Sequence, residues 1–435
     1  MKEKIKEILS YNQQRNFGQI VERDVWAPLD SGKIISFIGP RRAGKTHLLY
    51  LLINKVREAG IPRERVVFIN FEDERLLSDS FAFDLILEAL REMIPSVDFD
   101  LCYFFFDEIQ NIPDWEKFVR RLYEDHSKNI YLTGSNASFL STEIATSLRG
   151  RSLAVEVLPL SFREFLRFQG KSVDAFAYQE KALLLNSFRE YFSIGGFPEL
   201  VNMEEHLRIK VLQEYFNVMI HRDLVERFEI SQANLLKYFI KKMFLGVGKP
   251  LSINKVYNDF KSNKYTVSKN TLYDFLGFAK DAYVIRSLTK FDYSEMKREN
   301  SDKKAYACDW GLLSAIDYAV SKDLGRLFEN LVVLEFMKLL KPVFFYKQVN
   351  ECDLIVETSP NELLPVQITY DMSDADTRKR ELKGLSEAAK SLEVSRGLIL
   401  TMDQEEEIQK DNLQVKVIPA FKYFTMSTAQ LDFLF

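Results

Sequence analysis

GPRRAGKT, residues 39–46, is the stretch that decides the fold of this 435-residue chain. It fits the pattern G-x-x-x-x-G-K-[ST] and lies between a predicted buried strand, Lys33 to Ile38, and a predicted helix, Thr46 to Glu58. A strand therefore leads through a glycine-bearing loop into the N-terminus of a helix. At such a terminus, unpaired backbone N–H groups and the positive end of the helix dipole bind phosphate oxygens. The sequence predicts a nucleotide-phosphate site here rather than an ordinary glycine turn.

The loop residues have predicted contacts with a nucleotide. Lys45 is expected to reach the β- and γ-phosphates, and the hydroxyl of Thr46 is expected to bind Mg²⁺. The predicted phosphate-contacting residues in and beside the loop are Gly39, Pro40, Arg41, Arg42, Ala43, Gly44, Lys45, Thr46 and His47.

A second apolar strand supplies the other half of this site. Leu101 to Phe106 runs directly into Asp107 and Glu108. At the end of a strand beside the loop, Asp107 can hold Mg²⁺ through water, and Glu108 can polarise the water that attacks the γ-phosphate. Two adjacent acids also begin many solvated turns. Their distance along the chain from Lys45, with one further strand between (Val66 to Phe71), favours the catalytic interpretation.

Several polar residues at other strand ends allow two interpretations each. Ser135 and Asn136 follow the predicted strand Asn129 to Thr133, and they fit either a γ-phosphate sensor or a strand-to-helix cap. Arg149 and Arg151 precede the strand Ser152 to Val157, where they fit either an arginine finger or a solvated pair.

A third group, Asn70, Glu72 and Asp73, ends a strand near the site or simply opens a loop.

Composition limits the class of protein. Hydrophobic residues make up 46% and charged residues 28%, which is typical of a globular chain, and the net charge is −4. The cysteines, Cys102, Cys308 and Cys352, lie far apart and form no disulfide framework. No apolar run approaches the length of a membrane helix. We expect a cytoplasmic protein without a membrane partner.

Residues 161 to about 228 read as helical. Ser161 and Glu164 fit a capping box at the start of this region. The stretch Gly195 to Glu199, which contains Pro198, must interrupt it. Such a break fits a hinge, a contact of Pro198 with an adenine ring, or a turn between helices.

The segment from Ala233 to Ile316 has short helices with Ser and Asn caps, followed by a strand from Tyr283 to Leu288. This pattern predicts a winged helix-turn-helix with Ser268 to Lys280 as its recognition-type helix. Residues 249–304 carry 12 Lys and Arg against 7 Asp and Glu. The excess favours contact with a DNA backbone. A winged helix that acts as a lid or grips a protein remains the alternative.

The C-terminal order is helix, three strands, helix, strand, which resembles the restriction-endonuclease-like core. That resemblance implies a metal site at Asp353 and Gln367 with a helix acid, Glu329. Thr369 stands at the position of the core's lysine, so electrostatic stabilisation of a phosphorane is missing there. Lys347 or Lys379 are candidate substitutes. A nuclease and a degenerate binding fold both remain open.

Taken together, the chain resembles the prokaryotic, archaeal-type AAA-related P-loop ATPases with a winged helix and a restriction-endonuclease-like C-terminus. The resemblance rests on the motifs at residues 38–46, 70–76, 106–111, 132–135, 158–165, 195–199 and 377–381. It implies ATP and Mg²⁺ as cofactors and hydrolysis of ATP. It also implies nucleotide contacts for Arg23 and Pro198.

The predicted fold class is α/β, with a parallel-sheet P-loop ATPase core. The predicted domains are an N-terminal helix and connector (1–28), the ATPase core (29–160), a helical lid (161–232), the winged helix (233–320) and the restriction-endonuclease-like domain (321–435). The predicted function is an ATPase switch or motor on nucleic acid. The alternatives are an ATP-dependent nuclease and a signalling or scaffold ATPase with a protein partner, and the oligomeric state stays open.

Overall fold

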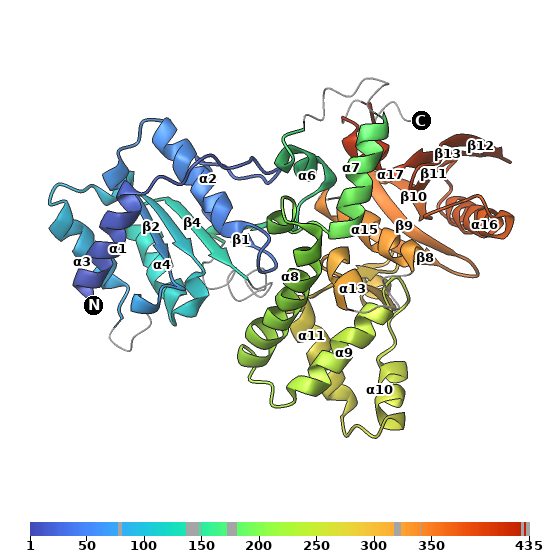
Figure 1. The fold of residues 1–435 in the computed structure, drawn as a ribbon, viewed down its shortest axis with the longest axis horizontal. Coiled ribbons are helices and arrows are strands. Elements are labelled where there is room, and N and C mark those ends of the chain that lie inside the picture. Colours follow the sequence, from blue (N-terminus) through green and yellow to red (C-terminus); the bar gives the residue numbers. More distant parts are fainter. Residues whose placement is uncertain are drawn as a thin grey trace. The chain divides into compact units, whose positions relative to one another are not determined.

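The computed structural model describes residues 1–76, 81–135, 148, 150–171, 181–316, 323–339, 341–427 and 430–431. The chain forms two compact units, Met1–Leu158 and Pro159–Phe435 (Figure 1). Among the described residues, no helix has both the length and the apolar character needed to span a bilayer.

The first unit is built on a five-stranded sheet in which every neighbouring pair is parallel. The order across the sheet is β2-β3-β4-β1-β5. The strands are β1 (Ile34–Ile38), β2 (Val66–Asn70), β3 (Tyr103–Asp107), β4 (Asn129–Gly134) and β5 (Ser152–Glu156). The first four are almost continuously buried, which explains why they read as unbroken apolar runs in the sequence. The predicted parallel α/β core is confirmed.

Helices cover both faces of this sheet. They are α1 (Lys2–Gln14), α2 (Lys45–Glu58), α3 (Asp84–Met93) and α4 (Trp115–Asp125). Side chains of α2 pack with Phe37 and Phe105 on one face, whereas α1, α3 and α4 pack with Phe104 and Phe106 on the other. Because β1, β3 and β4 are parallel neighbours, their carboxyl ends meet at one edge. This edge carries the loop that precedes α2.

The second unit begins with helices. These are α6 (Phe162–Phe168), α7 (Lys181–Ile194), the 3₁₀ turn Pro198–Leu200, α8 (Glu205–Val218) and a π-helical segment, Met219–Glu226. The predicted capping box is present, with Ser161 and Glu164 each bonded to the other's backbone N–H. The predicted break is also present, because α7 ends at Ile194. There the Gly196 N–H donates to Oδ2 of the buried Asp309 at 2.7 Å.

Five helices and two strands follow in the described part of the chain. They are α9 (Ala233–Leu245), α10 (Ile253–Ser262), α11 (Lys269–Asp281), β6 (Ile285–Thr289), α12 (Glu295–Asn300), β7 (Lys303–Ala307) and α13 (Trp310–Ile316). β6 and β7 pair antiparallel. Ser252 and Ser268 cap α10 and α11, as their positions before apolar-faced helices predict.

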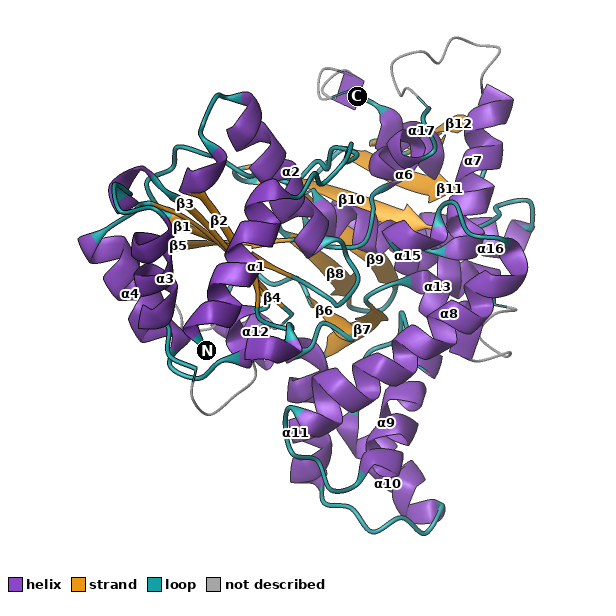
Figure 2. Cartoon of the chain, turned by 60° about the vertical axis from the view of Figure 1, so that its left-hand side comes forward, coloured by secondary structure: helices purple, strands orange, loops and turns teal. Residues whose placement is uncertain are grey.

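The chain ends in a mixed six-stranded sheet of order β12-β13-β11-β10-β9-β8. Its elements are α15 (Leu324–Lys338), β8 (Val343–Lys347), β9 (Glu351–Ser359), β10 (Glu362–Ile368), α16 (Ala375–Ser391), β11 (Arg396–Thr401), β12 (Glu406–Lys410), β13 (Leu413–Pro419) and α17 (Ala420–Thr425). α16 packs on one face, and α15 and α17 pack on the other. Figure 2 distinguishes the strands of this sheet from the helices by colour. The sequence prediction ended at β11 and missed the last three elements.

Candidate functional site

The loop of residues 39–46 takes a shape that only glycine permits at its first position. Gly39 has φ +155°, and a Cβ built on it would lie 2.0 Å from the carbonyl oxygen of Val157, just after β5. Gly44 has φ +95° and lies directly before α2. The two predicted glycines therefore let the backbone turn tightly from β1 into the N-terminus of α2.

Lys45 is the first residue of α2, and its side chain is only 4% exposed. Its Nζ donates to the carbonyl oxygens of Gly39 and Pro40 at 3.1 and 3.0 Å. The same Nζ lies 3.8 Å from Oε1 of Glu108. The ammonium group is thus held over the concave side of the loop and beside the acid that follows β3.

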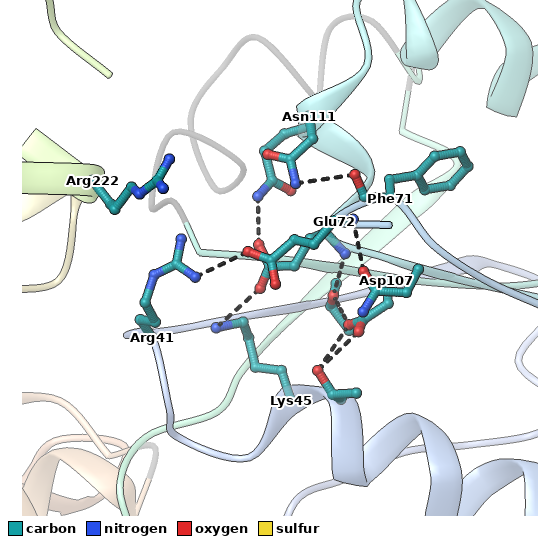
Figure 3. A network of polar contacts seen from close by, with 12 residues as sticks. Arg41, Lys45, Phe71, Glu72, Asp107, Asn111 and Arg222 are labelled. Carbon is teal, nitrogen blue, oxygen red and sulfur yellow. Dashed lines mark hydrogen bonds and ion pairs between the residues drawn. The ribbon is translucent and has the colours of Figure 1, made fainter. Parts of the chain in front are cut away.

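Asp107 joins three elements. Thr46 donates its hydroxyl to the Asp107 carboxylate at 3.1 and 2.9 Å, and Thr133 on β4 donates to Oδ1 at 2.6 Å (Figure 3). The pairing of Phe106 with Leu132 sets this register. A carboxylate and two hydroxyls, one from the loop and one from the central strand, therefore meet at the carboxyl edge of the sheet.

Glu108 has an unusual backbone for a glutamate, with φ +50°. Its N–H donates to the hydroxyl of Thr133 at 2.8 Å, and its Oε2 accepts from Nε2 of Gln110 at 2.5 Å. A left-handed conformation at a residue other than glycine costs free energy and often marks a functional position. Here it turns the chain so that Glu108 and Asp107 both face Lys45.

Burial and, to a smaller extent, the neighbouring charge of Glu108 raise the pKa of Asp107 to about 6, although the hydroxyls of Thr133 and Thr46 oppose the shift. In the absence of a cation, the buried carboxyl groups of Asp107 and Glu108 lie close together beside a single lysine, Lys45. A divalent cation would relieve this repulsion.

Two arginines extend the site. Arg41 of the loop donates from Nη1 to Oε1 of Glu72 at 3.0 Å (Figure 3). Arg23 donates to the carbonyl oxygens of Ala43 and Leu158, both at 2.8 Å, and so links the loop to the segment that follows β5.

The remaining predicted residues are less closely associated with the loop. Ser135 is buried just after β4. The ring of His47, in the first turn of α2, lies 5.6 Å from that of Tyr50. Asn70 uses its Oδ1 to accept from the N–H of Glu72. Asp73 pairs with Arg75. Arg42 is exposed with φ +66°.

Of four further predicted residues, one lies away from the loop and three are not placed relative to it. Arg151 precedes β5, and because Ile34 pairs with Ser152, Arg151 lies at the amino end of β1, whereas the loop leaves the carboxyl end. There it pairs with Glu124 at 2.6 Å. Pro198 belongs to the second unit. Arg149 and Asn136 lie outside the described residues.

The donor set at the loop fits Mg²⁺ and a nucleotide. Thr46 and Asp107 offer the hydroxyl and carboxylate oxygens that hard cations prefer, and the loop offers backbone N–H groups and Lys45 to phosphates. The described residues contain no group of three His, Cys, Asp or Glu side chains placed to hold a metal by themselves. A cation here would therefore take further oxygens from phosphate and water.

A cavity of about 520 Å³ lies in the second unit. Its lining comes from the segment that follows α9, from α15 and α16, and from the facing ends of β9 and β10. The predicted residues Glu329, Asp353, Gln367 and Thr369 all line it. The four positions that the restriction-endonuclease-like resemblance implied therefore share one cavity.

A lysine from β7 lies among these acids. Nζ of Lys304 is 3.2 Å from Glu329 Oε1, 2.7 Å from Glu351 Oε1 and 3.6 Å from Asp353 Oδ1, and its side chain is fully buried. Burial lowers the pKa of Lys304, but the surrounding charges of Glu329, Asp353 and Glu351 raise it more, so that it lies well above its usual range. Lys304 is thus an ammonium ion held mainly by Glu329 and Glu351, because burial raises the pKa of Asp353 to about 8.

The two lysines proposed from sequence as substitutes for Thr369 are not at the cavity. Lys347 pairs with Glu351 from the exposed side, and Lys379 is exposed on α16; neither lines the cavity. Thr369 donates its hydroxyl to the carbonyl oxygen of Asp371. The cation that reaches the acids comes from Lys304 instead, a residue assigned from sequence to a different domain.

Comparison with known proteins identifies relatives of the whole chain. The uncharacterized protein MJ1544 of Methanocaldococcus jannaschii is 34% identical over 420 residues, which are 93% of this chain and 91% of that protein. The chain belongs to the same family as this archaeal protein. An uncharacterized protein of Haemophilus influenzae is 29% identical and matches 79% of this chain and 83% of its own length.

Family models match three successive parts of the chain. Residues 31–166 match an AAA domain, and two domains of unknown function match residues 185–323 and 324–423. Among solved structures, the Orc1 protein of Aeropyrum pernix in complex with DNA is similar with a TM-score of 0.30 and 13% identity, over 78% of this chain and 93% of that chain. The AAA domain thus coincides with the loop and with Asp107 and Glu108.

Sequence reasoning missed three residues that the site uses. Thr133 was expected only as strand, although its place one residue beyond the partner of Phe106 sets it opposite Asp107. Gln110 lies two residues after Glu108, within reach of its carboxylate. Lys304 had no sequence signal, because only the packing of β7 near β9 brings it to the acids.

Proposed function

We propose that the first unit binds ATP with Mg²⁺ and hydrolyses it. The observation that carries the proposal is the convergence of Lys45, Thr46, Asp107 and Glu108 at one sheet edge, inside the stretch that matches an AAA domain. A glycine turn without a nucleotide role would need none of the four.

Each side chain has a role that its contacts support. The loop N–H groups and Lys45 bind the β- and γ-phosphates. Thr46 and Asp107 hold the cation, and the cation, when bound, neutralises charge on the phosphates. Glu108 polarises the attacking water. Its contact with Gln110 must loosen for this, because that amide occupies Oε2.

The test separates binding from turnover. Lys45→Ala is expected to abolish nucleotide binding, and Glu108→Gln is expected to keep binding while turnover falls about 10²-fold or more, because the base is lost but the phosphate contacts remain. A matched control is Glu64→Gln, which changes an exposed glutamate just before β2, at the opposite edge of the sheet. Wild-type turnover in Glu108→Gln would show that another group activates water.

We also propose that residues 233–320 form a winged helix and that this part of the chain contacts a nucleic-acid backbone. Three helices followed by the antiparallel pair β6 and β7 support the first point. Four exposed lysines support the second: Lys255, Lys261, Lys264 and Lys269, which lie on α10, α11 and the turn between them. Each phosphate contact would release counterions and make binding salt-dependent.

Neutralising the four lysines to glutamine should remove most affinity for duplex DNA and flatten its dependence on salt. Lys171, Lys383, Lys390 and Lys410 changed together serve as the control for net charge. If both variants bind DNA like the wild type, or if a stable protein partner is found and DNA leaves ATP turnover unchanged, the winged helix serves a protein instead.

A further inference from the structure

We propose that α11 binds single-stranded nucleic acid, with an unpaired base stacked on the ring of Tyr273 and the adjoining phosphates held by lysines of α10 and α11. This inference rests on the proposed contact between residues 233–320 and a nucleic-acid backbone, and it names the form of nucleic acid that the contact selects. It does not depend on ATP hydrolysis in the first unit.

The free ring of Tyr273 gives the first reason. Tyr273 is 55% exposed in the middle of α11. Within the described part of the chain, its side chain makes no hydrogen bond, ion pair or ring contact. Tyr265, which is 42% exposed, differs because its ring stacks on that of Tyr238 with the centroids 5.3 Å apart. A ring that the fold leaves free can stack on a base, and stacking requires a base whose face is not covered by a duplex.

Gly277 gives the second reason. It follows Tyr273 by one turn of α11, so the two positions are neighbours on the helix surface. Helical side chains lean toward the N-terminus, and a side chain at 277 would therefore cover the ring of Tyr273. No described atom lies within 4 Å of a Cβ built on Gly277. Glycine weakens a helix, and close packing does not require it here, so its effect is to leave the ring uncovered.

The lysines give the third reason. Lys269 lies one turn before Tyr273, and its Nζ is 5.4 Å from the centroid of the Tyr257 ring on α10. This cation–π contact holds the ammonium group on the same face of α11 as Tyr273. An ammonium group and a free ring one helical turn apart suit the phosphate and the base of a nucleotide. Three further exposed lysines lie on α10 and in the turn before α11: Lys255, Lys261 and Lys264. Among the described residues, none of these four lysines is in an ion pair.

The neighbouring acids leave this face open to phosphate. Asp259 on α10 pairs with Lys242 at 2.9 Å. Asp274 lies about 100° further around α11 than Tyr273. A protein surface could also cover a free tyrosine. The excess of Lys and Arg in residues 249–304, 12 against 7 Asp and Glu, favours a polyanion that carries bases.

The experiment compares three labelled probes on the full-length chain. They are a single-stranded oligothymidylate of about twelve nucleotides, the same chain with abasic sites in place of its bases, and a duplex of equal length. Fluorescence anisotropy gives the Kd for each. We expect oligothymidylate to bind about tenfold more tightly than the abasic chain, which keeps the phosphates but has nothing to stack. The duplex should bind more weakly than oligothymidylate, because its bases are paired.

Variants test the ring directly. Tyr273→Leu should lower the affinity for oligothymidylate roughly tenfold and leave the affinity for the abasic chain unchanged. Tyr273→Trp should keep the affinity for oligothymidylate, and its added indole fluorescence should be quenched on binding. Gly277→Leu should weaken oligothymidylate binding without lowering Tm, because leucine favours the helix but covers the ring. The matched control is Tyr11→Leu, which changes an exposed tyrosine of α1 and should leave all three affinities unchanged.

The outcomes separate this inference from the proposed function. Equal binding of oligothymidylate and the abasic chain, or wild-type affinity in Tyr273→Leu, would overturn base stacking and leave the backbone contact standing. Failure of the wild type to bind any of the probes would overturn both. A protein partner that is lost on Tyr273→Leu, with oligothymidylate affinity unchanged, would assign the ring to a protein interface instead.

Discussion

At the scale of single residues, Thr133 shows how one hydroxyl organises two acids. It donates to Asp107 and accepts from the N–H of Glu108, and it is fully buried. Thr133→Val keeps the shape but leaves that N–H without a partner and removes the shorter of the two hydroxyl contacts to Oδ1 of Asp107. We expect a loss of about 1–3 kcal/mol in the free energy of unfolding and a lower kcat. Thr133→Ser should recover both in thermal unfolding and turnover assays; equal defects in both variants would contradict this role.

Asp107 makes the nucleotide-free protein sensitive to pH. Burial and Glu108 raise the folded-state pKa to about 6, above the ordinary 3.8, so its contribution to stability is complete below about pH 4 and is lost as the pH rises through 6. Asp107→Asn removes this loss, which amounts to roughly 3 kcal/mol at most. The variant should gain in Tm over the wild type at pH 8 but much less at pH 4. The exposed Asp125→Asn should show no such trend. If the difference in Tm between Asp107→Asn and the wild type is the same at pH 4 and pH 8, Asp107 is not the group responsible for this pH dependence.

At the scale of elements, two helical glycines should respond oppositely to alanine. A Cβ on Gly384 of α16 would lie 2.1 Å from the carbonyl oxygen of Glu351 on β9, whereas nothing lies within 4 Å of a Cβ on Gly277 of α11. Gly384→Ala must push α16 off the sheet and is expected to cost about 1–3 kcal/mol in unfolding free energy. Gly277→Ala should add about 0.5–1 kcal/mol through helix propensity. Denaturant unfolding measures the change in unfolding free energy for each variant. If the two changes have the same sign, this account of how α16 packs is wrong.

The elements also show what the sequence could predict. Periodicity and caps located β1, α2, β4 and α11 within a residue, because burial in this protein follows the helical and strand patterns closely. β12 was missed, since its alternating burial on an edge of the sheet leaves a weak signal among charged residues such as Glu406 and Glu407. At the site, the motif predicted Lys45, Thr46, Asp107 and Glu108. Thr133 and Lys304 depend on strand register and on contacts between distant segments.

At the scale of the whole molecule, the two units should melt separately. A ligand that binds only the folded first unit stabilises that unit by RT ln(1 + [L]/Kd), which is about 2.7 kcal/mol at a hundredfold excess over Kd. In differential scanning calorimetry, ATP with Mg²⁺ is expected to raise one transition and leave the other in place. Lys45→Ala should abolish the shift. Equal shifts of both transitions would show that the units unfold as one.

The buried position of Lys304 limits where the chain can be cut. Three acids, Glu329, Glu351 and Asp353, belong to the residues after 323, while the ammonium group that neutralises them arrives from β7. A fragment beginning at residue 321 would keep the acids and discard their counter-ion. A fragment that keeps this charge balance must therefore include β7 as well as the six-stranded sheet.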